Sequence, residues 1–355
     1  MNEILDTLEG WLRRGKKIAV ATVVETWGSS PRPVGSKLAV TSEGDIAGSV
    51  SAGCVEGAVI EAAQEVIETG QPRLLTFGVA DEEAWEVGLA CGGTIRVFVE
   101  PFSAFGGVYE ALKRHLEARE PVAVISVLEG PTGQLNRKLI VSPDGRPEGD
   151  LSLTPEQQER VVGAVRSLIE REEGGTLELG EGLTVFVDVY PPAPRLIIVG
   201  AVHIARLLVP MAGLLGFDTY VIDPRRAFAT RERFPDATAL LHEWPRKALA
   251  RLPLDSFAYV VVLTHDPKLD DPALEVALAS DARYVGALGS RRTHEKRVRR
   301  LREAGLSDEQ LARLHAPIGI PLGGRSPAEI ALSIMAEIVQ VRNTSPASAV
   351  ISTAG

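Results

Sequence analysis

The sequence predicts an α/β protein of two domains, an N-terminal α/β domain and a C-terminal Rossmann-like domain with a parallel sheet. Its 355 residues are enough for two domains that each have their own core. Pro191, Pro192 and Pro194 form a stiff spacer. After the spacer, apolar strands alternate with helices, which is typical of a parallel sheet. We therefore expect an N-terminal domain at 1–190, a linker at 191–194, a Rossmann-like domain at 195–342 and a disordered tail at 343–355.

Composition restricts the class of protein. The net charge of −9 argues against broad nucleic-acid binding. Two cysteines in 355 residues argue against a disulfide-built secreted fold and suit the reducing cytoplasm. The N-terminal residues lack the basic start and apolar run of a signal peptide, and no apolar segment is long enough to span a membrane. We therefore expect a cytoplasmic protein that binds neither nucleic acid nor a membrane.

The first domain mixes helices and strands. An amphipathic helix over 3–14 precedes a strand over 18–24 that is rich in β-branched residues. A loop of turn-forming residues, 25–35, follows this strand. No internal repeat is visible in the sequence. Strands are also expected over 37–41, 94–99, 122–128 and 183–189, and helices over 107–119 and after the cap formed by Thr154, Pro155 and Gln157.

Cys54 lies where a strand-like run changes to a helical pattern. The small residues 51–53, which include Gly53, allow the backbone to turn tightly and to approach a ligand closely. The helical pattern covers 55–68, so Cys54 lies at or just before the helix N-terminus. There, unpaired backbone N–H groups and the positive end of the helix dipole favour a thiolate. The alternative is a small, buried hydrophobic residue.

Cys91 repeats this combination of a cysteine beside glycines. Gly92 and Gly93 follow it and lead into the strand over 94–99. The repetition favours an active role for Cys54 over a packing role. Because Cys91 leads into a strand, we expect it to be the more packed of the two cysteines.

The second domain opens with the start of a nucleotide-binding βαβ unit. An apolar strand over 195–199 ends at Gly200, and the strand after the next helix ends at Asp223, near the ribose-binding position. Val202 replaces the second glycine of the dinucleotide fingerprint. Its β-branched side chain obstructs the approach of a pyrophosphate to the backbone. We therefore predict the Rossmann fold without an ordinary dinucleotide site.

Polar residues follow the next buried strand of this domain. Thr264, His265 and Asp266 come directly after the strand over 259–263. Ligands of open α/β sheets bind outside the carboxyl ends of the strands, so these residues are candidates for a binding site. The alternative for Asp266 is that it caps the loop before Pro267.

Two turns that carry arginine precede helices. Ser290, Arg291 and Arg292 begin a helix, where the dipole and the guanidinium groups together suit a phosphate. Seven Lys or Arg residues and one Glu lie within 289–302, and for Arg299, Arg300 and Arg302 we expect a solvated helix face. Gly324 and Arg325 form a second cationic turn before a helix. Its capping box is Ser326, Pro327 and Glu329, and the helix reaches about Arg342.

The motifs together resemble one family. Gly-Ser-Ser-Pro-Arg at 28–32, Ser-Ala-Gly-Cys-Val-Glu at 51–56 and Cys-Gly-Gly at 91–93 lie in the first domain. Thr-His-Asp at 264–266, Gly-Ala-Leu-Gly-Ser-Arg-Arg-Thr at 286–293 and Gly-Gly-Arg-Ser-Pro-Ala-Glu-Ile-Ala at 323–331 lie in the second. In this combination the sequence resembles the xanthine dehydrogenase accessory protein family of the XdhC/CoxI type, over residues 12–340.

The resemblance implies a cofactor-handling chaperone rather than a catalyst. Such a protein binds the molybdenum cofactor (molybdopterin), protects it during sulfuration and delivers it to a xanthine dehydrogenase-type molybdenum hydroxylase. It also implies a cysteine desulfurase as a further partner and a homodimer. A phosphorylated pterin needs backbone N–H groups and arginines, and a soft metal centre suits a thiolate.

Residue by residue, the resemblance gives Cys54 the catalytic position, facing sulfur or molybdenum. No resident metal site is implied. The implied cofactor-binding residues are Gly53, Cys54, Gly200, Asp223, Thr264, His265, Asp266, Ser290, Arg291, Arg292, Gly324 and Arg325.

Two other functions remain open at this point. In an NAD(P)-dependent oxidoreductase, Asp223 would bind a ribose and His265 would carry a proton. An assembly scaffold would dock to the hydroxylase without binding a cofactor. Val202 argues against the oxidoreductase, and the two glycine-framed cysteines argue against the scaffold.

Overall fold

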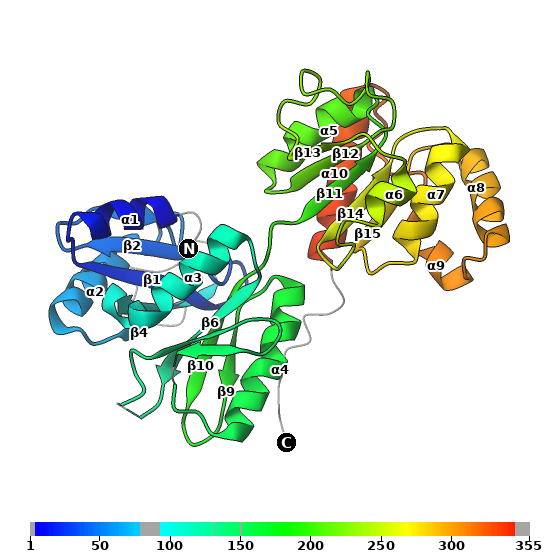
Figure 1. Cartoon of the computed structure of the whole chain (residues 1–355). Coiled ribbons are helices and arrows are strands. Elements are labelled where there is room, and N and C mark those ends of the chain that lie inside the picture. The colour runs from blue at the N-terminus through cyan, green and yellow to red at the C-terminus, as the bar shows by residue number, and fades with distance from the viewer. Residues whose placement is uncertain (1–3, 79–92, 132, 150, 345–355) are drawn as a thin grey trace. The chain divides into compact units, whose positions relative to one another are not determined.

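The computed structural model describes residues 4–78, 93–131, 133–149 and 151–344 (Figure 1). The chain divides into two compact units, Met1–Pro192 and Ala193–Gly355, and the division falls within the proline-rich segment 191–194. Apart from Asn343 and Thr344, the tail expected at 343–355 lies outside the described residues. No helix in the described part of the chain is both long enough and apolar enough to span a bilayer.

Unit 1 contains two five-stranded antiparallel sheets, with strand orders β3-β2-β1-β5-β4 and β8-β7-β6-β10-β9. The elements of the first half are α1 (Leu5–Arg13), β1 (Ile18–Trp27), β2 (Lys37–Thr41), β3 (Ile46–Gly48), α2 (Glu56–Thr69), β4 (Arg73–Phe77), β5 (Thr94–Pro101) and the 3-10 helix η2 (Phe102–Val108). Those of the second half are α3 (Tyr109–Ala118), β6 (Val122–Glu129), β7 (Lys138–Val141), β8 (Pro147–Gly149), α4 (Pro155–Arg171), β9 (Gly175–Glu178) and β10 (Thr184–Tyr190).

The two halves of unit 1 repeat one order of elements, a helix, three strands, a helix and two strands, and the 3-10 helix η2 lies between the halves. Gly48 ends the third strand of the first half and Gly149 ends that of the second, both with left-handed backbone, at φ +84° and +103°. A Cβ at Gly48 would lie 2.2 Å from the carbonyl oxygen of Lys37, and one at Gly149 would lie 2.6 Å from that of Lys138. This repeat is not visible in the sequence, because the halves share strand order and a few key positions rather than a recognisable sequence.

Two buried ion pairs join the halves reciprocally. Lys37 begins β2, and its Nζ lies 2.7 Å from Oδ2 of Asp188 in β10. Lys138 begins β7, and its Nζ lies 2.7 Å from Oε1 of Glu100 in β5. A buried charge without its partner is strongly destabilising, so each lysine must face the carboxylate of the opposite half. The two pairs therefore link the two sheets of unit 1.

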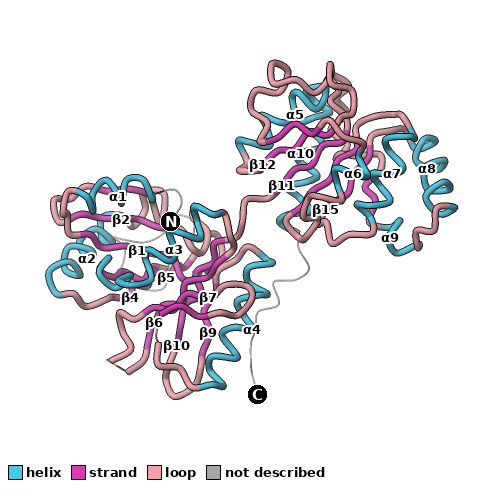
Figure 2. Tube along the Cα trace, in the orientation of Figure 1, coloured by secondary structure: helices cyan, strands magenta, loops and turns pink. Residues whose placement is uncertain are grey.

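Unit 2 contains a six-stranded parallel sheet, with the order β13-β12-β11-β14-β15-β16. This sheet, with helices on both faces (Figure 2), confirms the predicted α/β class and the parallel sheet. Its elements are β11 (Arg195–Val199), α5 (His203–Leu214), β12 (Asp218–Ile222), β13 (Ala239–Leu241), α6 (Pro245–Leu249), β14 (Ala258–Val262), α7 (Pro267–Leu278), β15 (Tyr284–Ala287), α8 (Arg291–Glu303), α9 (Asp308–Ala312), β16 (Leu314–His315) and α10 (Pro327–Asn343).

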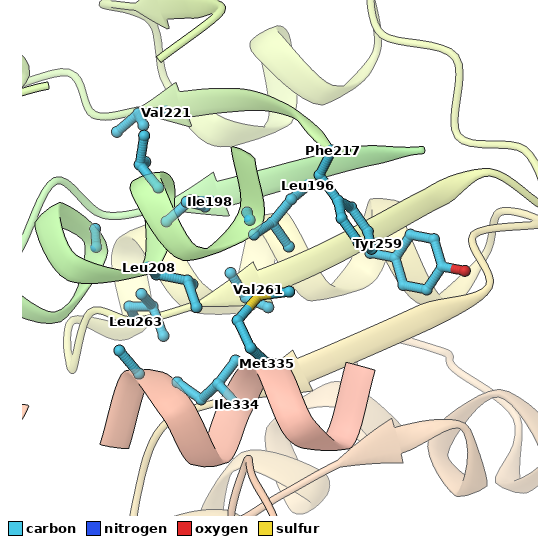
Figure 3. Close-up of a cluster of buried hydrophobic side chains, with 14 of the residues drawn as sticks. Leu196, Ile198, Leu208, Phe217, Val221, Tyr259, Val261, Leu263, Ile334 and Met335 are labelled. Carbon is cyan, nitrogen blue, oxygen red and sulfur yellow. The ribbon is translucent and has the colours of Figure 1, made fainter. Parts of the chain in front are cut away.

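Two apolar layers hold this sheet. Helices α5 and α10 cover one face, and Figure 3 shows Ile334 and Met335 of α10 pointing toward Val261 and Leu263. Helices α6 and α7, with α8 and α9, cover the other face. The capping box expected at Ser326 begins α10, as predicted from the local sequence.

The strand order of unit 2 reverses between β11 and β14. From β11 the chain adds β12 and β13 on one side, and then crosses back to add β14 on the other side. Loops at such a reversal diverge and leave a crevice in which open α/β sheets bind their ligands. The loops after β11 and β14 are therefore the expected binding edge of unit 2.

Candidate functional site

The three sequence motifs of the first domain attach to one end of the first sheet. Trp27, the last residue of β1, pairs with Thr94, the first residue of β5. At the same end, Gly48 at the close of β3 pairs with Leu38 near the start of β2. The segments 28–32 and 51–56 therefore leave the sheet from this end, and Gly93 enters it here.

The first and third motifs are in close backbone contact. A Cβ added at Gly93 would lie 2.1 Å from the carbonyl oxygen of Ser29 and 2.8 Å from that of Trp27. Any side chain at Gly93 would therefore displace the Gly28 loop. Cys91 and Gly92 lie outside the described residues, so the expectation that Cys91 is packed stays a prediction.

Cys54 is exposed, and it directly precedes Val55, the N-cap residue of α2. Its expected place just before a helix N-terminus agrees with this geometry. The alternative of a buried hydrophobic cysteine was wrong, because the loop carries the side chain to the surface. Ala52 and Gly53 both have left-handed backbone, at φ +55° and +113°, which turns the loop sharply before the cysteine.

Glu56 organises this loop, although it was not among the residues expected to form the site. Its carboxylate accepts hydrogen bonds from Ser49 Oγ at 2.6 Å, Ser51 N at 2.9 Å and Gly53 N at 2.8 Å, and also from the Ser51 hydroxyl. Burial raises the pKa of Glu56, but the hydrogen bonds from Ser49 and Ser51 outweigh it and lower the pKa to about 2. Glu56 is therefore an anion that holds the backbone on both sides of the turn before Cys54.

The second half of unit 1 builds the same fold with shorter loops at these positions. The segment between strand and helix is 49–55 in the first half and 150–154 in the second. The segment before the last strand is 78–93 in the first half and 179–183 in the second. The second half forms its sheet without these additional residues, so the sheet of the first half does not require them. Loops that are longer than the fold requires commonly carry function.

In unit 2, Gly200 and Thr264 are in contact at the reversal of strand order. Gly200 has φ +107°, and a Cβ there would lie 2.4 Å from Cγ2 of Thr264. Thr264 is buried and donates its hydroxyl to Asp270. His265 is exposed, and Asp266 caps α7 by accepting from Lys268 N at 3.0 Å. The capping role considered for Asp266 is therefore present in the structure.

Asp223 is buried, and protein donors already occupy its carboxylate. Oδ2 accepts from Ala201 N at 2.9 Å, and Oδ1 accepts from Arg225 N and Nε, both at 2.9 Å. Burial raises the pKa of Asp223, but the hydrogen bonds from Arg225 and Ala201 outweigh it and hold the pKa below its ordinary value. A ribose bound here would have to displace these donors, which weakens the oxidoreductase alternative.

The two cationic turns lie at helix N-termini as predicted. Ser290 caps α8 by accepting from Thr293 N at 3.2 Å, and Arg291 and Arg292 are exposed in its first turn. Before α10, Glu329 accepts from Arg325 N at 3.0 Å.

The side chain of Arg325 is exposed. The backbone of Gly324 lies so close to Glu329 that a Cβ at Gly324 would be 2.4 Å from Cβ of Glu329. Glycine is therefore required at position 324 to bring the backbone close to the helix start.

The structure thus gathers the predicted residues into two sets. Gly53 and Cys54 lie in the loop of unit 1, and the others lie in unit 2, where the loops after β11, β14 and β15 share one edge because their strands are parallel. Within the described ranges no three or more His, Cys, Asp or Glu residues gather as they would around a metal ion.

Comparison with known proteins decides the family. The model of the XdhC Rossmann domain matches residues 196–338, and the model of the XdhC and CoxI family matches residues 11–78. The chain belongs to the XdhC and CoxI family. The match over residues 11–78 contains the Gly28 loop and the Cys54 loop. The match over residues 196–338 contains the loops at the carboxyl edge of the parallel sheet.

Three similar proteins come from Escherichia coli and Bacillus subtilis, and the names of two of them state a role. The molybdenum cofactor insertion chaperone PaoD of Escherichia coli is 28% identical over 332 residues, which cover 93% of this chain and 85% of PaoD. A protein of Bacillus subtilis, named as a probable subunit of xanthine dehydrogenase, is 27% identical over 343 residues, 94% of this chain and 96% of that protein. The uncharacterized protein YqeB of Escherichia coli is 32% identical over 242 residues, which cover 64% of this chain but only 44% of YqeB.

A solved structure shares the fold. The crystal structure described as a xanthine dehydrogenase from Bacillus halodurans matches with a TM-score of 0.72 and 28% identity, and the match covers 98% of each chain. The likeness therefore extends over both units of the chain.

Proposed function

We propose that this protein binds the molybdenum cofactor, protects it during sulfuration and delivers it to a xanthine dehydrogenase-type molybdenum hydroxylase. The observation that carries the proposal is the exposed Cys54 on a loop held rigid by Glu56. A thiolate is the protein ligand that suits a soft metal or a sulfur atom in transit. The relative PaoD, named as a molybdenum cofactor insertion chaperone, supports the same role.

The carboxyl edge of unit 2 supports the binding of an anionic cargo. Backbone N–H groups at a helix start and arginine side chains are the groups that bind phosphate. Ser290, Arg291 and Arg292 supply both at α8, and Arg325 adds a second cation before α10. These residues, with Thr264 and His265, would hold the phosphorylated pterin.

The role also defines the surroundings of the protein. A carrier of this kind works in the cytoplasm, and its sulfur would come from a cysteine desulfurase. Assembly as a homodimer belongs to the same proposal. Sedimentation of the purified protein and co-purification with a desulfurase test these two associations directly.

Titration with purified molybdopterin cofactor and with NAD(P)H tests the proposal. The chaperone role predicts saturable binding of the molybdopterin cofactor and no binding of NAD(P)H. Binding of NAD(P)H alone would favour the oxidoreductase, and binding of neither would favour a scaffold. The occupied Asp223 carboxylate is the structural reason to expect no NAD(P)H binding.

A further inference from the structure

Arg297 of α8 is a buried cation in a run whose other cations are exposed, except for the half-buried Arg300. Only 1% of the residue is exposed. Its Nη2 donates to the carbonyl oxygen of Leu288 at 2.9 Å and lies 3.3 Å from Oδ2 of Asp270. Its Nε and Nη1 are buried without a hydrogen-bond partner among the residues that the structure describes. Because a buried donor without an acceptor is costly, two such donors on one charged group call for a physical reason.

The unsatisfied guanidinium lies beneath the turn that begins α8. A Cβ at Gly289 would lie 3.6 Å from Nη1 of Arg297, and Gly289 has φ +151°. Ser290 caps this helix of 13 residues, whose first turn presents N–H groups to the same turn. His294, in the first turn, also has a buried Nδ1 that no described residue satisfies. Two N–H groups of Arg297 and one ring nitrogen of His294 are therefore buried without a hydrogen-bond partner near the start of α8.

Arg297 also connects the loops of the binding edge. Asp270, its counter-ion, accepts the hydroxyl of Thr264 with its other carboxylate oxygen. Thr264 in turn lies against Gly200. Arg297 is thus linked through Asp270 and Thr264 to the loops after β11 and β14. Its hydrogen bond to the carbonyl oxygen of Leu288 links it to the loop after β15.

We propose that Arg297 supplies the buried positive charge of an oxyanion subsite formed by Gly289, Ser290 and the first turn of α8, and that its ligand is a phosphate group. The phosphate site itself does not depend on the proposed function. Only the assignment of its phosphate to the molybdenum cofactor rests on the proposed function. Arg297 is then a positioning residue, which acts through the turn above it. The exposed Arg291 and Arg292 complete the subsite from the solvent side.

Calorimetric titration of the full chain with inorganic pyrophosphate tests the subsite. Arg297→Met is expected to weaken pyrophosphate binding by at least about tenfold, because it removes the buried positive charge beneath the turn. Asp270→Asn keeps an acceptor for the Thr264 hydroxyl but removes the negative charge, so it is expected to bind pyrophosphate at least as tightly as the wild type. A merely structural network would lose affinity in both variants.

Arg297→Lys is the second variant, since it keeps the charge but loses the planar guanidinium. It is expected to bind pyrophosphate more weakly than the wild type and more tightly than Arg297→Met, and a loss of affinity in Arg297→Lys carries the test if Arg297→Met does not fold. The subsite is overturned if the wild type does not bind pyrophosphate at millimolar concentration. It is also overturned if Asp270→Asn weakens binding about tenfold or more, or if a folded Arg297→Met binds pyrophosphate as tightly as the wild type.

The outcome separates the subsite from the proposed function. If the variants respond to pyrophosphate as expected but the wild type does not bind molybdopterin cofactor, the subsite stands and the chaperone role fails. If the cofactor binds and pyrophosphate does not, the chaperone role stands and the subsite fails.

Discussion

The carboxylate of Glu56 accepts the backbone N–H of Gly53 at 2.8 Å, directly before the exposed Cys54. The same carboxylate accepts from Ser51 N and from the hydroxyls of Ser49 and Ser51. One anion thus holds the loop at four points. Pre-organisation of this kind lowers the entropic cost of binding.

Glu56→Gln is expected to loosen the Cys54 loop. The carboxamide keeps the size but lacks the charge, so the unfolding free energy should fall by about 1–2 kcal/mol after allowance for solvent screening. The exposed Glu61 on the same helix is the control, and Glu61→Gln should change little. Urea unfolding of both variants measures the difference, and equal losses would contradict the special role of Glu56.

The pH dependence of stability gives a second test of Glu56. The folded-state pKa of about 2 lies below the ordinary value of 4.5, so the stabilisation is complete above pH 4.5 and is lost as the pH falls toward 2. The stability difference between the wild type and Glu56→Gln should therefore shrink over this range. A difference that is constant from pH 6 to about pH 2.5 would show that the carboxylate charge is not what holds the loop.

Lys37→Met should strongly destabilise unit 1. The substitution leaves the buried Asp188 without its cation, which costs roughly 3–5 kcal/mol in comparable sites. Arg114→Met is the control, because Arg114 forms an exposed pair with Glu148 that contributes at most about 1 kcal/mol. Urea unfolding monitored by circular dichroism compares the two. Similar losses would mean that the reciprocal pairs do not fix the packing of the sheets.

Arg291→Ala is expected to cost roughly 1.5–3 kcal/mol of affinity for the molybdopterin cofactor, the range for a hydrogen bond to a charged group. Arg299 lies on the same helix and is also exposed, but it is two turns further from the N-terminus. Arg299→Ala should therefore change the affinity little. If both variants lose the same affinity, diffuse electrostatics rather than a specific contact explains the binding.

Local signals in the sequence predicted much of the fold. The capping boxes at Thr154 and Ser326 were predicted correctly because a few neighbouring residues determine them. The parallel sheet followed from alternating strands and helices. The place of Cys54 before α2 followed from the change in hydrophobic period.

Features that depend on distant residues could not be predicted. The repeat in unit 1 is visible only when strands are paired, since Lys37 and Lys138 find their carboxylates in the opposite half of the unit. Arg297 was hidden in a run of cations that is typical of a solvated helix face. The only sequence signal for Glu56 was its place early in α2 behind small polar residues, which resembles a capping box.

The ability of Cys54→Ser to transfer active cofactor decides whether the exposed thiol has a chemical role. Serine is close to cysteine in volume, and the side chain is exposed, so the variant should fold with an unchanged melting temperature. It should load molybdopterin cofactor but fail to activate a cofactor-free xanthine dehydrogenase-type hydroxylase in a reconstitution assay that includes a sulfur source. Full hydroxylase activity with Cys54→Ser would contradict the proposed function and leave Cys54 without a role in transfer.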